Sequence, residues 1–124
     1  MKLPPYAELL GLSIEPGAEA PVLVMPFADA VLGRPGFVHG GALGGLMEMA
    51  AVGALRQALG DDAVRIKPIN LSVDYMRGGR NKPTRARGHV SRLGNRIANI
   101  EVLAWQDDEA RPIAAGRINY LIVR

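Results

Sequence analysis

The chain contains no cysteine and only two histidines, His39 and His89, among its 124 residues. Without cysteine there are no disulfides, no thiolate nucleophiles and no cysteine-based zinc or iron–sulfur sites. Two histidines that lie fifty positions apart in the sequence do not favour a histidine-rich metal site either. We therefore predict that the protein holds no metal ion.

Long hydrophobic runs are also missing. No apolar segment reaches the ~20 residues that a membrane-spanning helix needs, and the first residues, MKLPPYAELLG, lack the apolar core of a signal peptide. Hydrophobic residues make up 48% of the chain and charged residues 22%, which is typical of a globular protein. We expect one domain over residues 1–124, located in the cytoplasm and without a membrane partner.

Acidic residues are absent from one stretch, although the net charge of the whole chain is only +3. Seven cations and no acid occur between positions 77 and 96, namely Arg77, Arg80, Lys82, Arg85, Arg87, Arg92 and Arg96. Such a stretch favours a ligand that carries phosphate, and a solvated charged face explains it equally well. The stretch has no aromatic residue on which a base could stack, so we expect no nucleic acid partner.

The segment after Gly36 is where we expect the chemistry. A Val38-His39-Gly40-Gly41 turn leads into a helix predicted to run from about Gly41 to Leu59. Between residues 42 and 55 Glu48 is the only charged residue, so this helix is expected to be buried almost all round. A carboxylate in such a place must be paired, hydrogen-bonded or used in chemistry.

The other predicted elements are short. Before the central helix we expect a helix over 5–10, a strand over 21–26 and a loop over 27–35. After it, apolar and polar residues alternate from Ile69 to Tyr75, which predicts a strand with one covered face. Three further strands are expected over about 84–92, 97–106 and 112–123. An antiparallel meander that covers an apolar helix curls around it, which is the α+β hotdog arrangement, although a flat α+β sandwich has the same element order.

Three motifs together resemble the hotdog-fold acyl-CoA thioesterases. They are Val38-His39-Gly40-Gly41 with Glu48, the segment IKPINLSVDYMR at 66–77, and Arg92-Leu93-Gly94. The chain looks closest to the phenylacetate-degradation type and to relatives that act on 4-hydroxybenzoyl-CoA. The resemblance covers about residues 9–123. Its most specific part is the acid nine positions after the histidine, which is Glu48 here.

The resemblance implies hydrolysis of an acyl- or aryl-CoA thioester to a free acid and CoA. The Gly40 backbone N–H would stabilise the oxyanion, with Gly41 helping the backbone to approach, and His39 would shape the turn or contact the thioester. Glu48 would either attack the thioester directly or activate a water molecule. No cofactor is implied, because CoA is part of the substrate. The expected CoA-binding residues are Arg77, Arg80, Lys82, Arg92 and Arg96.

Two positions depart from the family pattern. Gly33 stands where relatives often carry Asn or Gln, and Pro68 stands where many carry Thr or Ser. Two outcomes are then open: either polar assistance to the acid is poorer than in the family, or Asn70 or Ser72 supplies it in another geometry. Two other functions fit the same fold. One is a non-catalytic acyl-CoA-binding protein, and the other, ranked lowest, is a dehydratase or isomerase that uses His89.

The spacing of Gly40 and Glu48 predicts a homo-oligomer. Eight residues of helix place them roughly 12 Å apart, whereas a donor and a nucleophile that act on one carbonyl must each lie within about 3 Å of it. Two antiparallel helices across a twofold axis can combine Gly40 of one chain with Glu48 of the other. The glycines at 44, 45 and 53 would let such helices approach closely. Tetramers are common in the resembled family.

Overall fold

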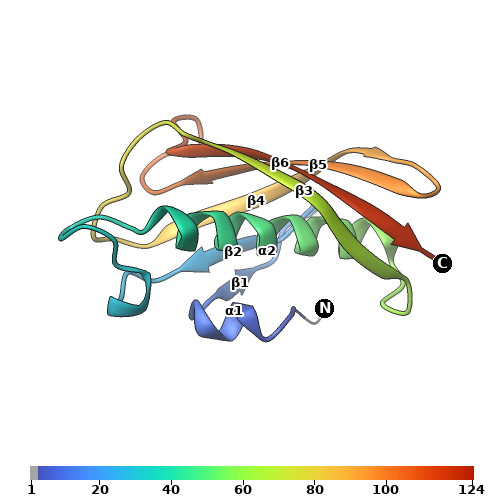
Figure 1. The fold of residues 1–124 in the computed structure, drawn as a ribbon, viewed down its shortest axis with the longest axis horizontal. Coiled ribbons are helices and arrows are strands. Elements are labelled where there is room, and N and C mark those ends of the chain that lie inside the picture. The colour runs from blue at the N-terminus through green and yellow to red at the C-terminus, as the bar shows by residue number, and fades with distance from the viewer. Residues whose placement is uncertain (1–2) are drawn as a thin grey trace.

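A six-stranded antiparallel sheet packs against one long helix in the computed structural model, which describes residues 3–124 (Figure 1). The sheet bends around the helix, so the predicted α+β hotdog fold is confirmed. In chain order the elements are α1 (Tyr6–Leu9), β1 (Ser13–Glu15), β2 (Val22–Met25), the 3-10 helix η1 (Asp29–Val31), α2 (Gly40–Leu59), β3 (Arg65–Tyr75), β4 (Thr84–Leu93), β5 (Ile97–Trp105) and β6 (Ala114–Val123).

Helix α2 has the bounds that its terminal residues predict. His39 is the N-cap, with an extended backbone and a side chain that accepts a hydrogen bond from the first turn. Gly60 ends the helix with a φ of 67°, a left-handed conformation that suits glycine, and its N–H donates to the Arg56 carbonyl at 3.0 Å. The helix therefore begins one residue before the predicted start and ends at the predicted residue.

The strand order differs from the expected four-strand meander. Strands β4, β5 and β6 do follow one another, but β3 pairs with β6, from Arg65 opposite Val123 to Tyr75 opposite Ala114. The segment 76–83 that joins β3 to β4 is too long for the two-residue turn of a tight hairpin, so it can carry the chain across the end of the sheet. The prediction of a four-strand meander is wrong for β3, which is an edge strand.

The core lies between α2 and the inner face of the sheet. On β5 the inward residues are Ala98, Ile100, Val102 and Ala104, all buried as the alternation predicts. Gly88 on β4 sits directly against α2, because a Cβ added there would lie 2.9 Å from the Ala54 Cβ and 3.0 Å from the Ala50 carbonyl oxygen. The close packing of helix and sheet therefore depends on a residue without a side chain at this point.

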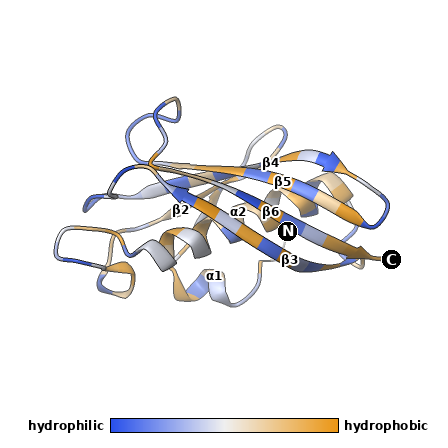
Figure 2. Cartoon of the chain, turned by 45° about the horizontal axis from the view of Figure 1, so that its top comes forward, coloured by the Kyte–Doolittle hydropathy of each residue, from blue (hydrophilic) through white to orange (hydrophobic). Residues whose placement is uncertain are grey.

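Helix α2 is buried more completely than the edge strand β3. Between residues 42 and 55 only Gly45 and Glu48 are half-buried and the others are buried, so the expectation of a helix buried almost all round is confirmed. The neighbouring edge strand β3 has alternating hydrophobic and hydrophilic residues (Figure 2). Its apolar residues stay exposed, with Ile69 at 53%, Leu71 at 43% and Tyr75 at 56%. The alternation predicted that the apolar face of β3 is covered. In a single chain this face is not covered.

We predict that Gly88→Ala destabilises the fold by about 1–3 kcal/mol, because the added methyl must push α2 away from β4. Urea denaturation of the variant and of the wild type measures this difference. His89→Ala is the matched control, since His89 is the next residue of the strand and is exposed on the other face. Equal stability of the wild type and Gly88→Ala would contradict the packing role of Gly88.

Candidate active site

The two residues expected to carry the chemistry, Gly40 and Glu48, lie on α2 and border two different cavities. The Gly40 cavity has a volume of about 440 Å³ and includes Gly33, His39, Tyr75 and Arg77 in its wall. The Glu48 cavity has a volume of about 490 Å³ and includes Met49, Val52, Pro68 and Tyr120. Along the helix axis the two residues are about 12 Å apart. One chain therefore does not bring them to one carbonyl group.

Two backbone N–H groups at the start of α2, those of Gly40 and Gly41, differ in whether they have a hydrogen-bond acceptor. The His39 Nδ1 accepts a hydrogen bond from the Gly41 N–H at 2.9 Å. This requires a neutral imidazole whose proton is on Nε2. Within residues 3–124 no acceptor engages the Gly40 N–H. The open donor at the positive end of the helix dipole is therefore that of Gly40, while the His39 side chain caps the first turn.

Tyr75 contacts the carbonyl group of Gly40. Its hydroxyl donates to the Gly40 carbonyl oxygen at 2.8 Å, and a Cβ added at Gly40 would lie 3.5 Å from the Tyr75 ring. The Tyr75 hydroxyl oxygen would also lie 3.6 Å from a Cβ at Gly44, and the Tyr6 ring of α1 would lie 2.7 Å from a Cβ at Gly45. Within one chain, the space beside Gly44 and Gly45 is therefore filled by the tyrosine side chains of Tyr75 and Tyr6. The sequence placed Tyr75 on a strand but gave no sign of this contact.

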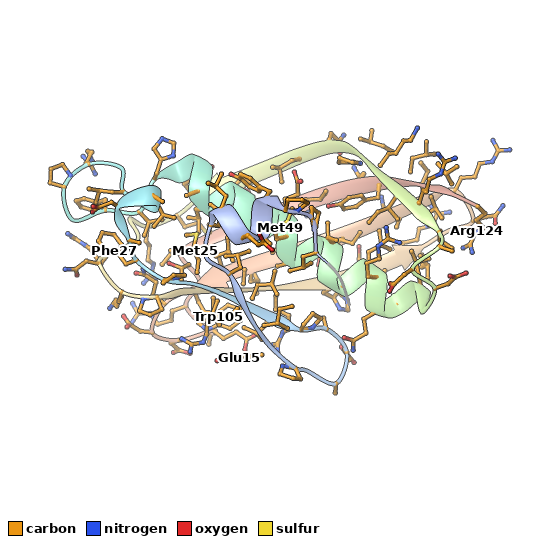
Figure 3. The ribbon with its side chains drawn as sticks, turned by 90° about the horizontal axis from the view of Figure 1, so that it is seen from below. Glu15, Met25, Phe27, Met49, Trp105 and Arg124 are labelled. Atoms are coloured by element: carbon orange, nitrogen blue, oxygen red, sulfur yellow. The ribbon has the colours of Figure 1, made fainter. Side chains whose placement is uncertain are left out.

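The Glu48 carboxylate lies in mostly apolar surroundings. The N-terminal segment and α1 cross the middle of α2, which Figure 3 marks by Met49, the residue after Glu48. Besides Glu48, the charged residues of this cavity are Arg56 and Asp62. Glu48 forms no ion pair with any other described residue. The only acid of the helix interior therefore remains available for chemistry.

Tyr120 is a second polar residue of the Glu48 cavity that the sequence did not reveal. Its side chain comes from the inner face of β6 and is 1% exposed. Its hydroxyl has no hydrogen-bond partner in the described part of the chain. Burial, with a further contribution from the charge of Glu48, raises the pKa of Tyr120 well above its usual range. The hydroxyl therefore keeps its proton and can act as a donor.

Asn70 and Ser72 lie on the outer face of the sheet, away from Glu48. Asn70 accepts a hydrogen bond from Asn119 at 2.8 Å, and Asn119 accepts one from Asn99 at 2.6 Å. Ser72 pairs with Arg117, which is exposed, whereas the residues on either side of Arg117 in β6 are buried. Ser72 and Arg117 therefore share the outer face. The prediction that Asn70 or Ser72 assists Glu48 is therefore wrong, because the pairing of β3 with β6 turns both side chains outward.

The seven cations of the basic stretch do not form one surface. Lys82 pairs with Asp107 at 2.7 Å, Arg85 with Glu15 at 3.3 Å, and Arg87 with Glu109. These acids come from other parts of the chain, so the lack of acids within the stretch does not leave all its cations unpaired.

The remaining four cations lie at two ends of the molecule. Arg77 and Arg80 follow β3, near Gly40, and Arg80 stacks on the Phe37 ring at 4.3 Å, with Arg34 on the same ring at 4.5 Å. Arg92 and Arg96 lie at the β4–β5 hairpin at the opposite end of α2 (Figure 1).

His89 has no place in either cavity. It is exposed on the outer face of β4, opposite Glu101, and borders an open depression of about 1250 Å³ that includes neither Gly40 nor Glu48. Among residues 3–124 no three His, Asp or Glu side chains come together as metal ligands. No helix in this part of the chain is long and apolar enough to cross a membrane.

Several solved structures resemble this one. A protein from Chromobacterium violaceum is 32% identical, with a TM-score of 0.75 over 94% of this chain and 82% of that chain. A thioesterase from Haemophilus influenzae is 19% identical, with a TM-score of 0.85 over 96% of this chain and 82% of that one. A Bacillus halodurans protein crystallised with CoA is 19% identical, with a TM-score of 0.85 over 96% and 78%. The last two similarities establish the fold alone.

The sequence itself matches a protein family. No curated protein matches it significantly. The family model described as the thioesterase superfamily matches residues 35–113, which is more than half of the chain and contains His39, Gly40, Gly41 and Glu48. The chain belongs to the thioesterase superfamily.

Proposed function

We propose that the protein is an acyl-CoA thioesterase, which hydrolyses an acyl- or aryl-CoA thioester to a free acid and CoA. The observation that carries the proposal is the combination of an open Gly40 N–H with an unpaired Glu48 carboxylate on α2. Membership of the thioesterase superfamily supports it, and so does the fold that the chain shares with a protein crystallised with CoA.

The proposed roles follow from the charges that the reaction develops. The Gly40 N–H would donate to the thioester oxygen as it becomes an oxyanion, helped by the dipole of α2. Glu48 would either attack the carbonyl carbon, giving a mixed anhydride that water then opens, or take a proton from an attacking water. In both routes the carbon–sulfur bond breaks and the sulfur of CoA leaves as a thiol. His39 would act by orienting the turn that presents Gly40.

Glu48→Gln should keep the fold and lower kcat by at least ~10²-fold, because the amide has the same shape but is neither nucleophile nor base. A thiol reagent that reports the release of CoA from a panel of acyl-CoA esters measures the effect. Circular dichroism and the melting temperature serve as controls for folding. Turnover by folded Glu48→Gln at the wild-type rate would remove Glu48 from the mechanism.

A non-catalytic acyl-CoA-binding protein is the second candidate. Gly33 and Pro68 favour it, since neither position supplies a polar side chain to the reacting groups. A Cβ at Gly33 would lie 3.0 Å from the His39 Cα, so a larger residue would disturb the turn there. The same panel separates the candidates, because saturable binding without release of CoA would indicate the binder.

We also propose that the active form is a homodimer with two sites, each shared between subunits. The distance of about 12 Å along α2 prevents Gly40 and Glu48 of one chain from meeting at one carbonyl. The exposed apolar residues of the edge strand β3 offer a surface on which a second copy can pack. An antiparallel arrangement of two α2 helices would bring Gly40 of each chain to Glu48 of its partner. Two such dimers could form a tetramer.

Mixing two inactive variants tests this arrangement. Gly40→Pro removes the N–H but suits the first position of a helix, and the extended backbone of His39 suits a residue before proline. After subunit exchange with Glu48→Ala, half of the dimers are mixed and each has one intact site, so we expect about a quarter of wild-type activity.

Gly40→Ala is the matched control for this experiment. It keeps the N–H, and its Cβ would make an ordinary contact with Tyr75 at 3.5 Å, so it should retain activity. A mixture that stays inactive although mass spectrometry demonstrates exchange would refute the shared site.

The unpaired cations would bind the phosphate groups of CoA. Arg77 and Arg80 lie near Gly40, and Arg92 and Arg96 lie near the other end of α2, so an antiparallel partner would bring the two groups toward each other. Guanidinium groups bind phosphate in bidentate fashion. Lys82 is included in the proposal, although Asp107 pairs with it in the free protein.

Arg80→Gln and Arg92→Gln should each raise KM for acyl-CoA by about 3- to 30-fold with little change in kcat, because they contact only the remote end of the substrate. The control is Arg85→Gln, which removes a cation that Glu15 already pairs. Initial rates at varied substrate concentration measure both constants. Unchanged KM values for both variants would assign these residues to a solvated face.

A further inference from the structure

The Tyr120 hydroxyl is a buried polar group without a partner among the residues that the structure describes. A buried hydroxyl that makes no hydrogen bond destabilises a fold, and such groups are rare in native proteins. A phenylalanine would fill the same space on the inner face of β6 without this cost. The presence of tyrosine therefore calls for a partner that its hydroxyl does not contact in this structure.

The Glu48 cavity offers such a partner. Tyr120 and Glu48 border it together, from β6 and α2, with Pro68 of β3 beside them. The other charged groups of this cavity are Arg56 and Asp62. The Arg56 guanidinium donates to the Val64 carbonyl at the far end of α2, and Asp62 lies beyond the end of the helix. Glu48 is thus the acceptor on the helix side of the cavity.

The protonation state of Tyr120 suits a donor. Burial raises the pKa of its hydroxyl, and the negative charge of Glu48 raises it further. The tyrosine therefore keeps a proton that it can donate.

We propose that Tyr120 is a positioning residue, whose O–H donates to one Glu48 carboxylate oxygen when an acyl group fills the cavity and leaves the other oxygen to act. This inference rests on the proposed thioesterase function. Hydrogen bonds of catalytic groups are often long or unformed in free enzymes and shorten in the substrate complex. The half-buried Glu48 side chain has room to turn toward β6 in a cavity of about 490 Å³. Tyr120 itself transfers no proton.

The role has two measurable consequences. A donor to one oxygen fixes the direction of the carboxylate, so its loss lowers kcat while the binding of CoA and KM stay nearly unchanged. A donor also stabilises the ionised form of a carboxylate, so its loss moves the acidic limb of the pH–rate profile to higher pH. A tyrosine that only fills space produces neither change when its hydroxyl is removed.

The test compares Tyr120→Phe with the wild type. We expect kcat to fall at least ~10-fold, KM to change by less than ~3-fold, the acidic limb to move to higher pH, and the melting temperature to stay equal or rise. Tyr6→Phe is the control. It also removes a hydroxyl near α2, but Tyr6 does not border the Glu48 cavity. In a Glu48→Gln background Tyr120→Phe should have no further effect on kcat, since the group it positions is already gone.

The outcomes separate this proposal from the function on which it rests. An active wild type with an unchanged kcat and pH profile in Tyr120→Phe overturns the role of Tyr120 and leaves the thioesterase intact. Equal losses from Tyr120→Phe in the wild type and in Glu48→Gln would also overturn it, because the tyrosine would then act without Glu48. A wild type that releases no CoA from any ester of the panel overturns the thioesterase function and the tyrosine's role together.

Discussion

The packing of α2 onto the sheet is the constraint on which the rest of the structure depends. The helix is apolar along most of its surface, and it can lie close to β4 because Gly88 presents only backbone to Ala50 and Ala54. That packing makes the helix rigid and keeps Gly40 and Glu48 at a constant separation. A rigid helix gives each group a defined position, but it also prevents both from reaching the same substrate atom within one chain.

The edge strand β3 connects this constraint to assembly. Its pairing with β6 leaves its other edge without a partner strand, and its apolar residues remain exposed. Soluble proteins usually protect such edges with charges, prolines or another chain. Pro68 interrupts the donors of β3, but the apolar residues at 69, 71 and 75 remain accessible. In the proposed homodimer, the second copy would cover these residues and complete the proposed site with the same contact.

The positions of the helices and strands along the chain could be predicted from the sequence more fully than the pairing of the strands with one another. The His-Gly-Gly turn, the helix-ending Gly60 and the alternation of Ala98 to Ala104 are local signals, so α2 and β5 could be located closely. The pairing of β3 with β6 is not local, and therefore the outward direction of Asn70 and the inward place of Tyr120 could not be predicted. The ion pairs of Lys82, Arg85 and Arg87 were missed for the same reason, because their acids come from distant segments.

The start of α2 is held from two sides, which bears on how well it can stabilise charge. The His39 imidazole accepts from the Gly41 N–H, and the Tyr75 hydroxyl donates to the Gly40 carbonyl. Both contacts leave the N–H of Gly40, which borders its cavity, without an acceptor among residues 3–124. A donor that is already oriented needs no reorganisation when negative charge develops nearby, and this lowers the barrier more than a donor that must first turn. In the proposed mechanism, the restraint of Gly40 by His39 and Tyr75 would therefore help to stabilise the oxyanion as much as its lack of a side chain does.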